Sequence, residues 1–147
     1  MILRDEAETM AVGVELAGVV RAGDLVTLSG DLGAGKTTLA RGLLRGLGLQ
    51  EEAPSPSFAI MLPYHPPQVR LPVAHVDLYR LEDPGELEEL GLSEARADGL
   101  LLVEWPERAA RAPVLADALA IRLDLVDGGR RLTADVPPAW EQRWPPR

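Results

Sequence analysis

The sequence predicts an α/β domain whose mostly parallel sheet is flanked by helices and ends in an antiparallel hairpin. Three short apolar runs of strand length, at 24–29, 73–81 and 100–105, alternate with helical patterns. A glycine-rich loop joins the first run to a helix. After residue 118, apolar and polar residues alternate on both sides of an Asp-Gly-Gly turn, a pattern typical of a hairpin with one solvent-exposed face. Strands that alternate with helices favour a parallel sheet.

The N-terminal elements are predicted by capping residues and apolar spacing. Asp5 and Glu8 resemble a helix cap with its capping-box partner, and apolar residues then recur at helical spacing over about 6–21. The run 24–29 is β-branched and apolar, which indicates a buried strand that ends at the glycine loop. The leucines between residues 36 and 47 share one helix face, and Gly46 or Gly48 is expected to end that helix.

The middle of the chain is rich in proline. Residues 51–72 hold six of the 13 prolines, so we expect a loop, a short strand near 57–62 and another loop. A strand is predicted at 73–81. Asp83 as cap, Pro84 at the first helical position and Glu86 then predict a helix that runs to about residue 98. The hairpin completes a single domain at 1–137, and the proline- and tryptophan-rich tail at 138–147 is expected to pack as irregular chain or to fray.

Composition places the chain among cytoplasmic globular proteins. It has 147 residues, no cysteine and no apolar run long enough to cross a membrane. The first ten residues contain acidic groups where a secretory signal would carry basic ones. The net charge of −8, from 23 acidic and 15 basic residues, argues against direct binding to a nucleic acid, since binding to a nucleic-acid backbone needs a basic surface.

Residues 30–37 fit the phosphate-loop spacing G-x-x-x-x-G-K-[ST], and their place between a strand and a helix is the context that this motif requires. The expected fold is therefore P-loop NTPase-like. Glycines let backbone N–H groups approach phosphate oxygens, and the helix adds its positive end. Lys36, the only lysine of the chain, is expected to reach the β- and γ-phosphates, and Thr37 to bind Mg²⁺. The predicted phosphate-binding residues are Gly33, Ala34, Gly35, Lys36, Thr37 and Thr38.

Two carboxylates are candidates for the acidic partner of Mg²⁺. Asp77 and Glu104 each follow an apolar run, where an ionised group needs a metal or a partner. Each can instead cap a helix or pair with a nearby arginine, Arg80 or Arg108. Which of the two binds the metal directly stays open at this point.

Several other residues have two interpretations. His75 and His65 lack metal-ligand spacing, and His75 is expected to pack or to hydrogen-bond locally. Trp105 suits a core or an interface, although stacking near a nucleotide is an alternative. Ser55 and Ser57 lie in a loop that is either a sensor of the γ-phosphate or a plain surface turn. The chain has no asparagine and no second lysine for an Asn-Lys-x-Asp guanine-binding element, so ATP is the expected nucleotide.

Taken together, these motifs resemble the TsaE-type P-loop ATPases of tRNA threonylcarbamoyladenosine biosynthesis. The resemblance spans nearly the whole chain. It covers residues 9–48 with the phosphate loop, "SPSF" (55–58), "HVDLYRLEDPGELEELGL" (75–92) and "LLLVEWPER" (100–108). The family usually has threonine where this chain has Ser57, so a role for that hydroxyl is less secure.

The resemblance implies an accessory ATPase that binds ATP and Mg²⁺ and hydrolyses ATP slowly without its partners. These partners are the other protein subunits of the complex that transfers a threonylcarbamoyl group to adenosine 37 of tRNA. Lys36, Asp77 and Glu104 are then the catalytic candidates, and Thr37 and Glu104 the metal ligands. The resemblance also places Thr9 near the base and Arg130 near the nucleotide, and makes 54–58 and 77–81 nucleotide-sensitive switches.

Two other functions remain possible on sequence grounds. A small-molecule kinase would need an acceptor pocket and an arginine-bearing lid, and residues 62–72 offer one arginine among four prolines. A nucleotide-gated protein-binding module with negligible turnover would need only the phosphate loop.

Overall fold

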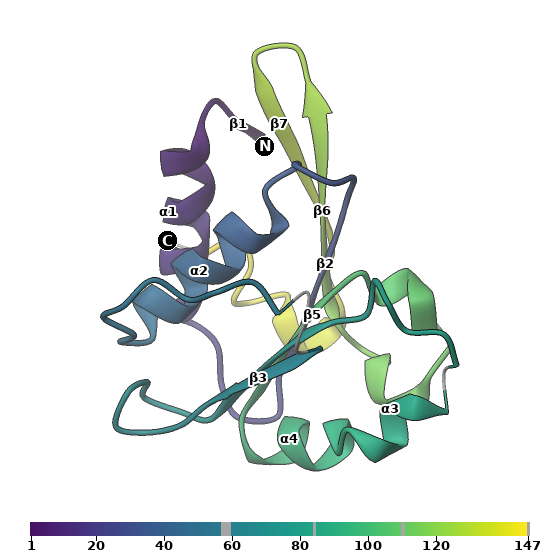
Figure 1. Ribbon diagram of the computed structural model, residues 1–147. Coiled ribbons are helices and arrows are strands. Elements are labelled where there is room, and N and C mark those ends of the chain that lie inside the picture. The colour runs from purple at the N-terminus through teal and green to yellow at the C-terminus, as the bar shows by residue number, and fades with distance from the viewer. Residues whose placement is uncertain (57–59, 84, 110, 147) are drawn as a thin grey trace.

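Four parallel strands form the middle of a seven-stranded sheet in the computed structural model, which describes residues 1–147 except 57–59, 84, 110 and 147 (Figure 1). The strand order is β1-β7-β6-β2-β5-β4-β3, with β6, β2, β5 and β4 parallel. The outer pairs β1–β7, β6–β7 and β3–β4 are antiparallel. The expected α/β architecture with a terminal hairpin is confirmed, and the parallel part is confined to the centre of the sheet.

The bounds of the elements are as follows. The helices are α1 (Glu6–Ala17), α2 (Lys36–Gly46), α3 (Glu86–Glu89) and α4 (Leu92–Asp98). The strands are β1 (Ile2–Leu3), β2 (Leu25–Ser29), β3 (Met61–Tyr64), β4 (Val73–Asp77), β5 (Leu100–Glu104), β6 (Leu119–Val126) and β7 (Gly129–Asp135). Short 3-10 helices are η1 (Pro106–Ala109), η2 (Pro113–Leu115) and η3 (Pro138–Trp140).

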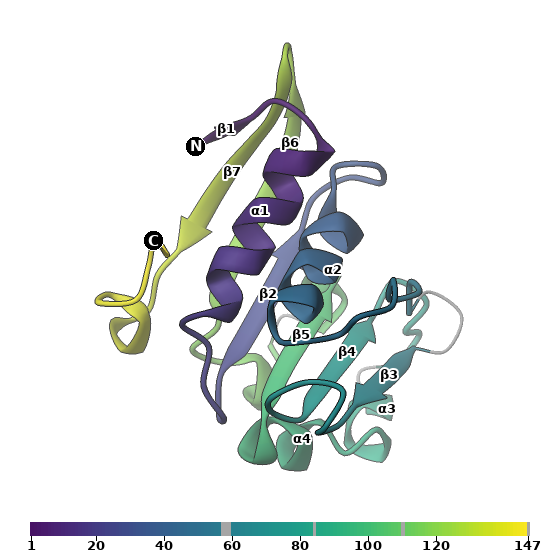
Figure 2. The same cartoon turned by 90° about the vertical axis from the view of Figure 1, so that its left-hand side faces the viewer.

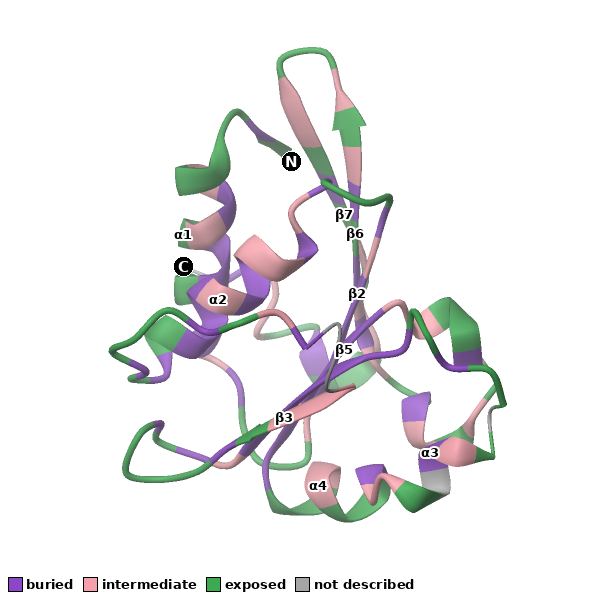
Figure 3. Ribbon diagram, viewed as in Figure 1, coloured by how far each residue is buried: buried purple, intermediate pink, exposed green. Residues whose placement is uncertain are grey.

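The two faces of the sheet carry separate cores. Helices α1 and α2 cover one face, and α3 and α4 lie on the other (Figures 1 and 2). Neighbouring residues of β5 alternate between these cores, so that Leu102 packs with α1 and α2 and Val103 packs towards α3 and α4. Every residue of β4 and β5 is buried, whereas the tip of the β6–β7 hairpin is exposed (Figure 3). Continuous apolar runs were therefore the right signal for these central strands.

Helices α1 and α2 pack closely because glycines line their contact. A Cβ on Gly13 would lie 2.2 Å from the carbonyl oxygen of Leu39, and one on Gly42 would lie 2.2 Å from that of Met10. The backbones therefore approach to a distance that no larger residue allows. This contact holds α2, and with it the phosphate loop, against the rest of the domain.

Several predicted boundaries were wrong. Helix α1 ends at Ala17 rather than near residue 21, because the chain turns at Gly18. The helix predicted to run to Asp98 is two short helices, since Gly91 adopts a left-handed φ of 68° between them. Strand β4 ends at Asp77 rather than at residue 81, because the Asp77 carboxylate accepts a hydrogen bond from the Tyr79 N–H (2.8 Å) and starts a turn.

Other differences concern the edges of the sheet. Strand β1 was not predicted, because its two residues are too few to show a pattern. Strand β3 begins at Met61, later than the strand expected near 57–62. Ser57 and Pro84, which entered the predictions, lie outside the described residues. No helix in the described part of the chain is both long and apolar enough to cross a bilayer.

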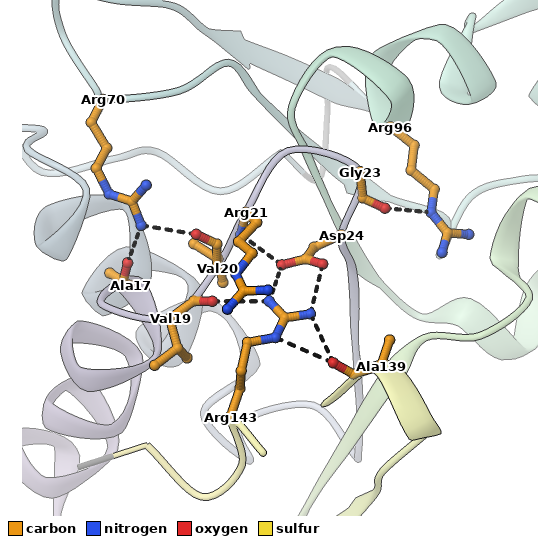
Figure 4. A network of polar contacts seen from close by, with 10 residues as sticks. All are labelled: Ala17, Val19, Val20, Arg21, Gly23, Asp24, Arg70, Arg96, Ala139 and Arg143. Carbon is orange, nitrogen blue, oxygen red and sulfur yellow. Dashed lines mark hydrogen bonds and ion pairs between the residues drawn. The ribbon is translucent and has the colours of Figure 1, made fainter. Parts of the chain in front are cut away.

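The C-terminal tail packs on the domain, which is the first of the two outcomes expected for it. Trp140 is buried in the core to which α1 and α2 contribute, and Arg143 forms a bidentate ion pair with Asp24 at 2.6 and 3.0 Å. Arg143 also donates to the carbonyl of Val19, while Arg70 donates to those of Ala17 and Val20 (Figure 4). Two arginines therefore satisfy the carbonyl groups that follow α1.

Candidate phosphate-binding site

The loop between β2 and α2 turns so tightly that glycine is required at its ends. Gly30 has a φ of 135°, and a Cβ there would lie 2.1 Å from the carbonyl oxygen of Leu123. Gly35 has a φ of 107° and is the residue before α2 begins. The first N–H groups of α2 have no partner within the helix, so the loop and the helix end together offer donors to an anion.

A cavity of about 210 Å³ lies at this loop and is lined by residues from five parts of the chain. Of the residues predicted from the sequence, it is lined by Gly33, Gly35, Lys36, Thr37, Thr38, Asp77, Glu104 and Arg130. Glu6, Leu32 and Trp105 complete the lining. Ala34, within the loop, and Thr9, on α1, do not line the cavity and are buried.

Lys36 folds back onto the loop that precedes it. Its Nζ donates to the carbonyl oxygens of Gly30 (2.5 Å) and Asp31 (3.0 Å) and lies 4.2 Å from the centre of the Trp105 ring. Burial lowers the pKa of Lys36 below its ordinary value, against the opposing effect of nearby carboxylates, of which Glu104 is the strongest. The ammonium therefore lies beside the cavity with weak neutral partners that a phosphate can replace.

Both carboxylate oxygens of Glu104, at the end of β5, have side-chain partners. Oε1 accepts a hydrogen bond from the Thr37 hydroxyl (3.0 Å), and Oε2 lies 2.7 Å from Nε2 of His75. Glu104 and His75 are 2% and 0% exposed, so the carboxylate depends on these two partners in place of water. With Glu104 ionised, Nε2 carries the ring proton and donates it. The oxygens of Thr37 and Glu104 thus converge on one point at the start of α2.

Asp77 lies beside Glu104 in the sheet. The two residues are paired in the parallel register of β4 and β5, so both carboxylates lie at the same end of neighbouring strands. Asp77 accepts a hydrogen bond from the Tyr79 N–H, whereas Glu104 accepts one from the Thr37 hydroxyl. The two carboxylates therefore lie side by side but have different hydrogen-bond partners.

Thr9 and Arg130 meet the loop at Gly35, although they come from α1 and β7. A Cβ on Gly35 would lie 3.2 Å from Nε of Arg130 and 3.4 Å from the Thr9 methyl group. The Thr9 hydroxyl is used within α1, where it donates to the carbonyl of Asp5. The Arg130 guanidinium donates to the Gly33 carbonyl at 3.4 Å, and its buried Nε has no hydrogen-bond partner among the described residues. An unpaired guanidinium nitrogen at a phosphate loop fits an anionic ligand.

Sequence reasoning missed the roles of two residues. His75 was expected to act locally, but it contacts Glu104, which is 29 positions away in the chain. Its position two residues before Asp77, on the same side of a strand, was the available signal. Trp105 has a φ of 59° and packs against Tyr79 with ring centres 4.8 Å apart, so it forms the floor beneath Lys36.

The fold and the loop define the class of this chain, which is a P-loop protein. In such proteins a glycine loop between a buried strand and a helix holds phosphate groups, and a carboxylate on a neighbouring strand completes the site. Within the described residues, no group of three His, Asp or Glu side chains is placed to hold a metal ion. A cation at Thr37 and Glu104 would therefore need further oxygen atoms from a bound phosphate and water.

Comparison with known proteins identifies the family. The model described as "Threonylcarbamoyl adenosine biosynthesis protein TsaE" matches residues 3–132. The tRNA threonylcarbamoyladenosine biosynthesis protein TsaE of Streptomyces coelicolor is 43% identical over 118 residues, which cover 80% of this chain and 79% of that protein. The protein of the same name from Treponema pallidum is 35% identical over 134 residues, covering 90% and 96%. The chain belongs to the TsaE family.

A solved structure agrees with this assignment. The crystal structure of YdiB from Bacillus subtilis superposes with a TM-score of 0.77 and 29% identity, covering 97% of this chain and 87% of that one. The similarity therefore extends over the described fold and over the elements that form the phosphate loop.

Proposed function

We propose that this chain is an accessory ATPase of tRNA threonylcarbamoyladenosine biosynthesis, which binds Mg-ATP and acts on adenosine 37 of tRNA through a protein complex. Membership of the TsaE family supports the pathway. The observation that supports ATPase activity most directly is that Lys36, Thr37 and Glu104 line one cavity at the N-terminus of α2. The proposed place of action is the cytoplasm.

Phosphate binding is assigned to the loop and to two cations. The backbone N–H groups of 33–38 surround the phosphates, and Lys36 exchanges the carbonyls of Gly30 and Asp31 for phosphate oxygens. The Arg130 Nε, which is buried and unpaired, is available to the same anion. The Thr9 methyl group packs behind Gly35, so we propose that Thr9 acts on nucleotide binding by supporting the loop.

Glu104 and Thr37 are proposed to hold Mg²⁺, which when bound neutralises charge on the β- and γ-phosphate oxygens. The Thr37 hydroxyl and Glu104 Oε1 are already 3.0 Å apart, so both oxygens need little movement to face one ion. Asp77 lies beside Glu104 on the neighbouring strand, and we propose that it orients the attacking water by accepting a hydrogen bond from it. The segments 54–58 and 77–81 are proposed to change position with the nucleotide.

Hydrolysis is expected to be slow in the isolated chain. In P-loop enzymes an arginine finger contributes about 10³–10⁵ in rate, and it is often supplied by a partner. Arg130 is directed to the loop and donates to the Gly33 carbonyl, so its present contact does not stabilise a leaving phosphate. We therefore propose that the other subunits of the threonylcarbamoyl-transferase complex stimulate hydrolysis.

The test combines binding and turnover. Lys36→Ala should lower ATP affinity by at least about tenfold, because the cation that meets the phosphates is removed. Arg131→Ala, which removes an exposed cation beside Arg130, is the matched control and should bind ATP as the natural chain does. ATP affinity measured by calorimetry, and hydrolysis measured with and without the transferase subunits, decide the matter. Hydrolysis as fast in the isolated chain as in the complex would contradict the proposal.

The two rival functions make different predictions. A kinase needs an acceptor pocket beside the γ-phosphate. A groove of about 880 Å³ does exist, but none of its lining residues lines the phosphate cavity. Phosphorylation of a small metabolite at a rate above that of ATP hydrolysis would favour the kinase. A binding module without turnover would be favoured if Glu104→Ala abolished hydrolysis and left partner function intact.

A further inference from the structure

An aromatic ring lies against the Lys36 ammonium at the phosphate cavity. Lys36 is only 5% exposed, and its Nζ lies 4.2 Å from the centre of the Trp105 ring. Its hydrogen bonds go to the carbonyl oxygens of Gly30 and Asp31, which are neutral partners. An ammonium that has left water is attracted more strongly to an indole face than an exposed one. The position of the Trp105 ring therefore helps to decide where the ammonium rests.

Trp105 needs support from its neighbours to hold this position. Its φ of 59° is uncommon for a residue other than glycine, and such a backbone conformation persists only where surrounding contacts determine it. The Trp105 N–H donates to the carbonyl of Leu28 (3.1 Å), which fixes the backbone at the end of β5. This bond does not fix the side chain, which is half-buried and lines the cavity. The ring therefore depends on the side chains packed against it.

The Tyr79 ring is one of these contacts. The ring centres of Tyr79 and Trp105 are 4.8 Å apart and their planes are inclined by 53°, a tilted arrangement within the range that favourable aromatic pairs adopt. The Arg108 guanidinium lies 5.3 Å from the centre of the Tyr79 ring, which belongs to a side chain on a residue that is 41% exposed. Four side chains thus form a continuous series from the surface to the cavity: Arg108, Tyr79, Trp105 and Lys36.

The backbone joins Tyr79 to the carboxylates of the cavity. The Tyr79 N–H donates to the Asp77 carboxylate (2.8 Å), and the N–H of Leu78 donates to the carbonyl of Glu104 (3.0 Å). Tyr79 itself does not line the cavity, so its ring reaches a bound phosphate through Trp105 and Lys36. Because Asp77 does line the cavity, a ligand that draws its carboxylate away from the Tyr79 N–H also loosens the turn that carries the ring.

We propose that Tyr79 is a positioning residue for Lys36. Its ring holds Trp105 in one orientation, and Trp105 in turn holds the ammonium beside the cavity, where it meets the phosphates without first having to be ordered. A change at Asp77 on nucleotide binding reaches Lys36 by the same route. The inference rests on the proposed function and deepens it, since it gives the segment 77–81 a physical means of acting on the phosphate site.

The experiment uses the fact that Lys36 is the only lysine of the chain. Labelling with ¹³C-lysine therefore gives a single set of lysine side-chain signals in an NMR spectrum, and the ring current of Trp105 shifts the methylene protons next to the ammonium upfield. Tyr79→Leu removes the tyrosine ring, and Tyr79→Phe retains an aromatic ring. Arg108→Gln removes the cation on Tyr79, with Arg111→Gln as the matched control at a nearby exposed arginine. ATP affinity and the unfolding midpoint of each variant are measured in parallel.

The Lys36 signals of the natural chain should lie upfield of those in the urea-unfolded chain. In Tyr79→Leu they should move towards the unfolded values, and the dissociation constant for ATP should rise by about 3–10-fold, because the ring pair no longer orders Trp105. Tyr79→Phe should keep the natural signals and, within about 1.5-fold, the natural affinity. Arg108→Gln should change both in the same direction as Tyr79→Leu but less, and Arg111→Gln should change neither.

A Tyr79→Leu chain that keeps either the natural Lys36 signals or the natural ATP affinity would overturn this inference and leave the proposed function intact. An equal loss of affinity in Tyr79→Phe would do the same, since it would assign the effect to the hydroxyl. If Tyr79→Leu does not fold, Arg108→Gln decides, and unchanged Lys36 signals in that variant would overturn the inference. A natural chain that binds no ATP would contradict the proposed function, and the inference with it, whatever the Lys36 signals show.

Discussion

Replacing His75 by leucine tests whether this residue positions Glu104. The ring is fully buried, and its Nε2 lies 2.7 Å from the Glu104 carboxylate. A hydrogen bond to a charged group contributes about 1.5–3 kcal/mol, and the oxygen left behind has no access to water. We expect the free energy of unfolding to fall by about 2–3 kcal/mol and, for a domain of this size, the midpoint to fall by about 4–10 °C.

A structural defect alone would not change the dependence on metal, which gives the experiment its second readout. Residues that orient a metal ligand typically contribute about 10–100-fold in metal affinity. The ratio of ATP affinity with Mg²⁺ to ATP affinity in EDTA should therefore fall by about that factor in His75→Leu. His75→Gln, which retains an N–H donor, should recover part of the ratio, and His65→Leu, at an exposed histidine, should change nothing. An unchanged ratio in His75→Leu would refute the positioning role.

Three further predictions concern the loop, the helix pair and the tail. Burial lowers the pKa of Lys36 and bound ATP phosphates should raise it again, so ATP affinity should be constant at pH values below the lowered pKa and fall as the pH rises above it. Calorimetry in two buffers should detect proton uptake on ATP binding in that pH window. An ATP affinity that is unchanged up to about pH 10 would contradict this prediction. Gly13→Ala should lower the free energy of unfolding, measured by urea denaturation, by about 1–3 kcal/mol, since the new Cβ would lie 2.2 Å from a carbonyl oxygen of α2. The control Gly18→Ala, at a φ of −71°, should change the free energy of unfolding by less than about 1 kcal/mol. Arg143→Ala leaves the Asp24 carboxylate, 11% exposed, without its ion-pair partner and should cost about 3–5 kcal/mol in the same assay; a loss below about 1 kcal/mol would mean that the tail is not part of the folded unit.

The elements that the sequence predicted well are those whose signal is local. The glycine loop, β2 and α2 follow from a motif in which each residue type has a stereochemical reason. The buried strands β4 and β5 were visible as apolar runs, and Asp77 and Glu104 were visible as the carboxylates at their ends. The errors at element ends arose from turns, such as the one at Gly91, whose positive φ interrupts a helical pattern without changing its polarity.

The amino-acid sequence by itself determined that this chain has an α/β fold with a phosphate loop, because strand length, helix spacing and glycine placement act between residues close together in the chain. It also placed the chain near the TsaE family through motifs that occur in order. Only the tertiary structure decided which carboxylate meets Thr37, that His75 supports it, and that Thr9 and Arg130 meet at Gly35. These contacts depend on strand order and register, which bring together residues that are tens of positions apart, and no local pattern records that order.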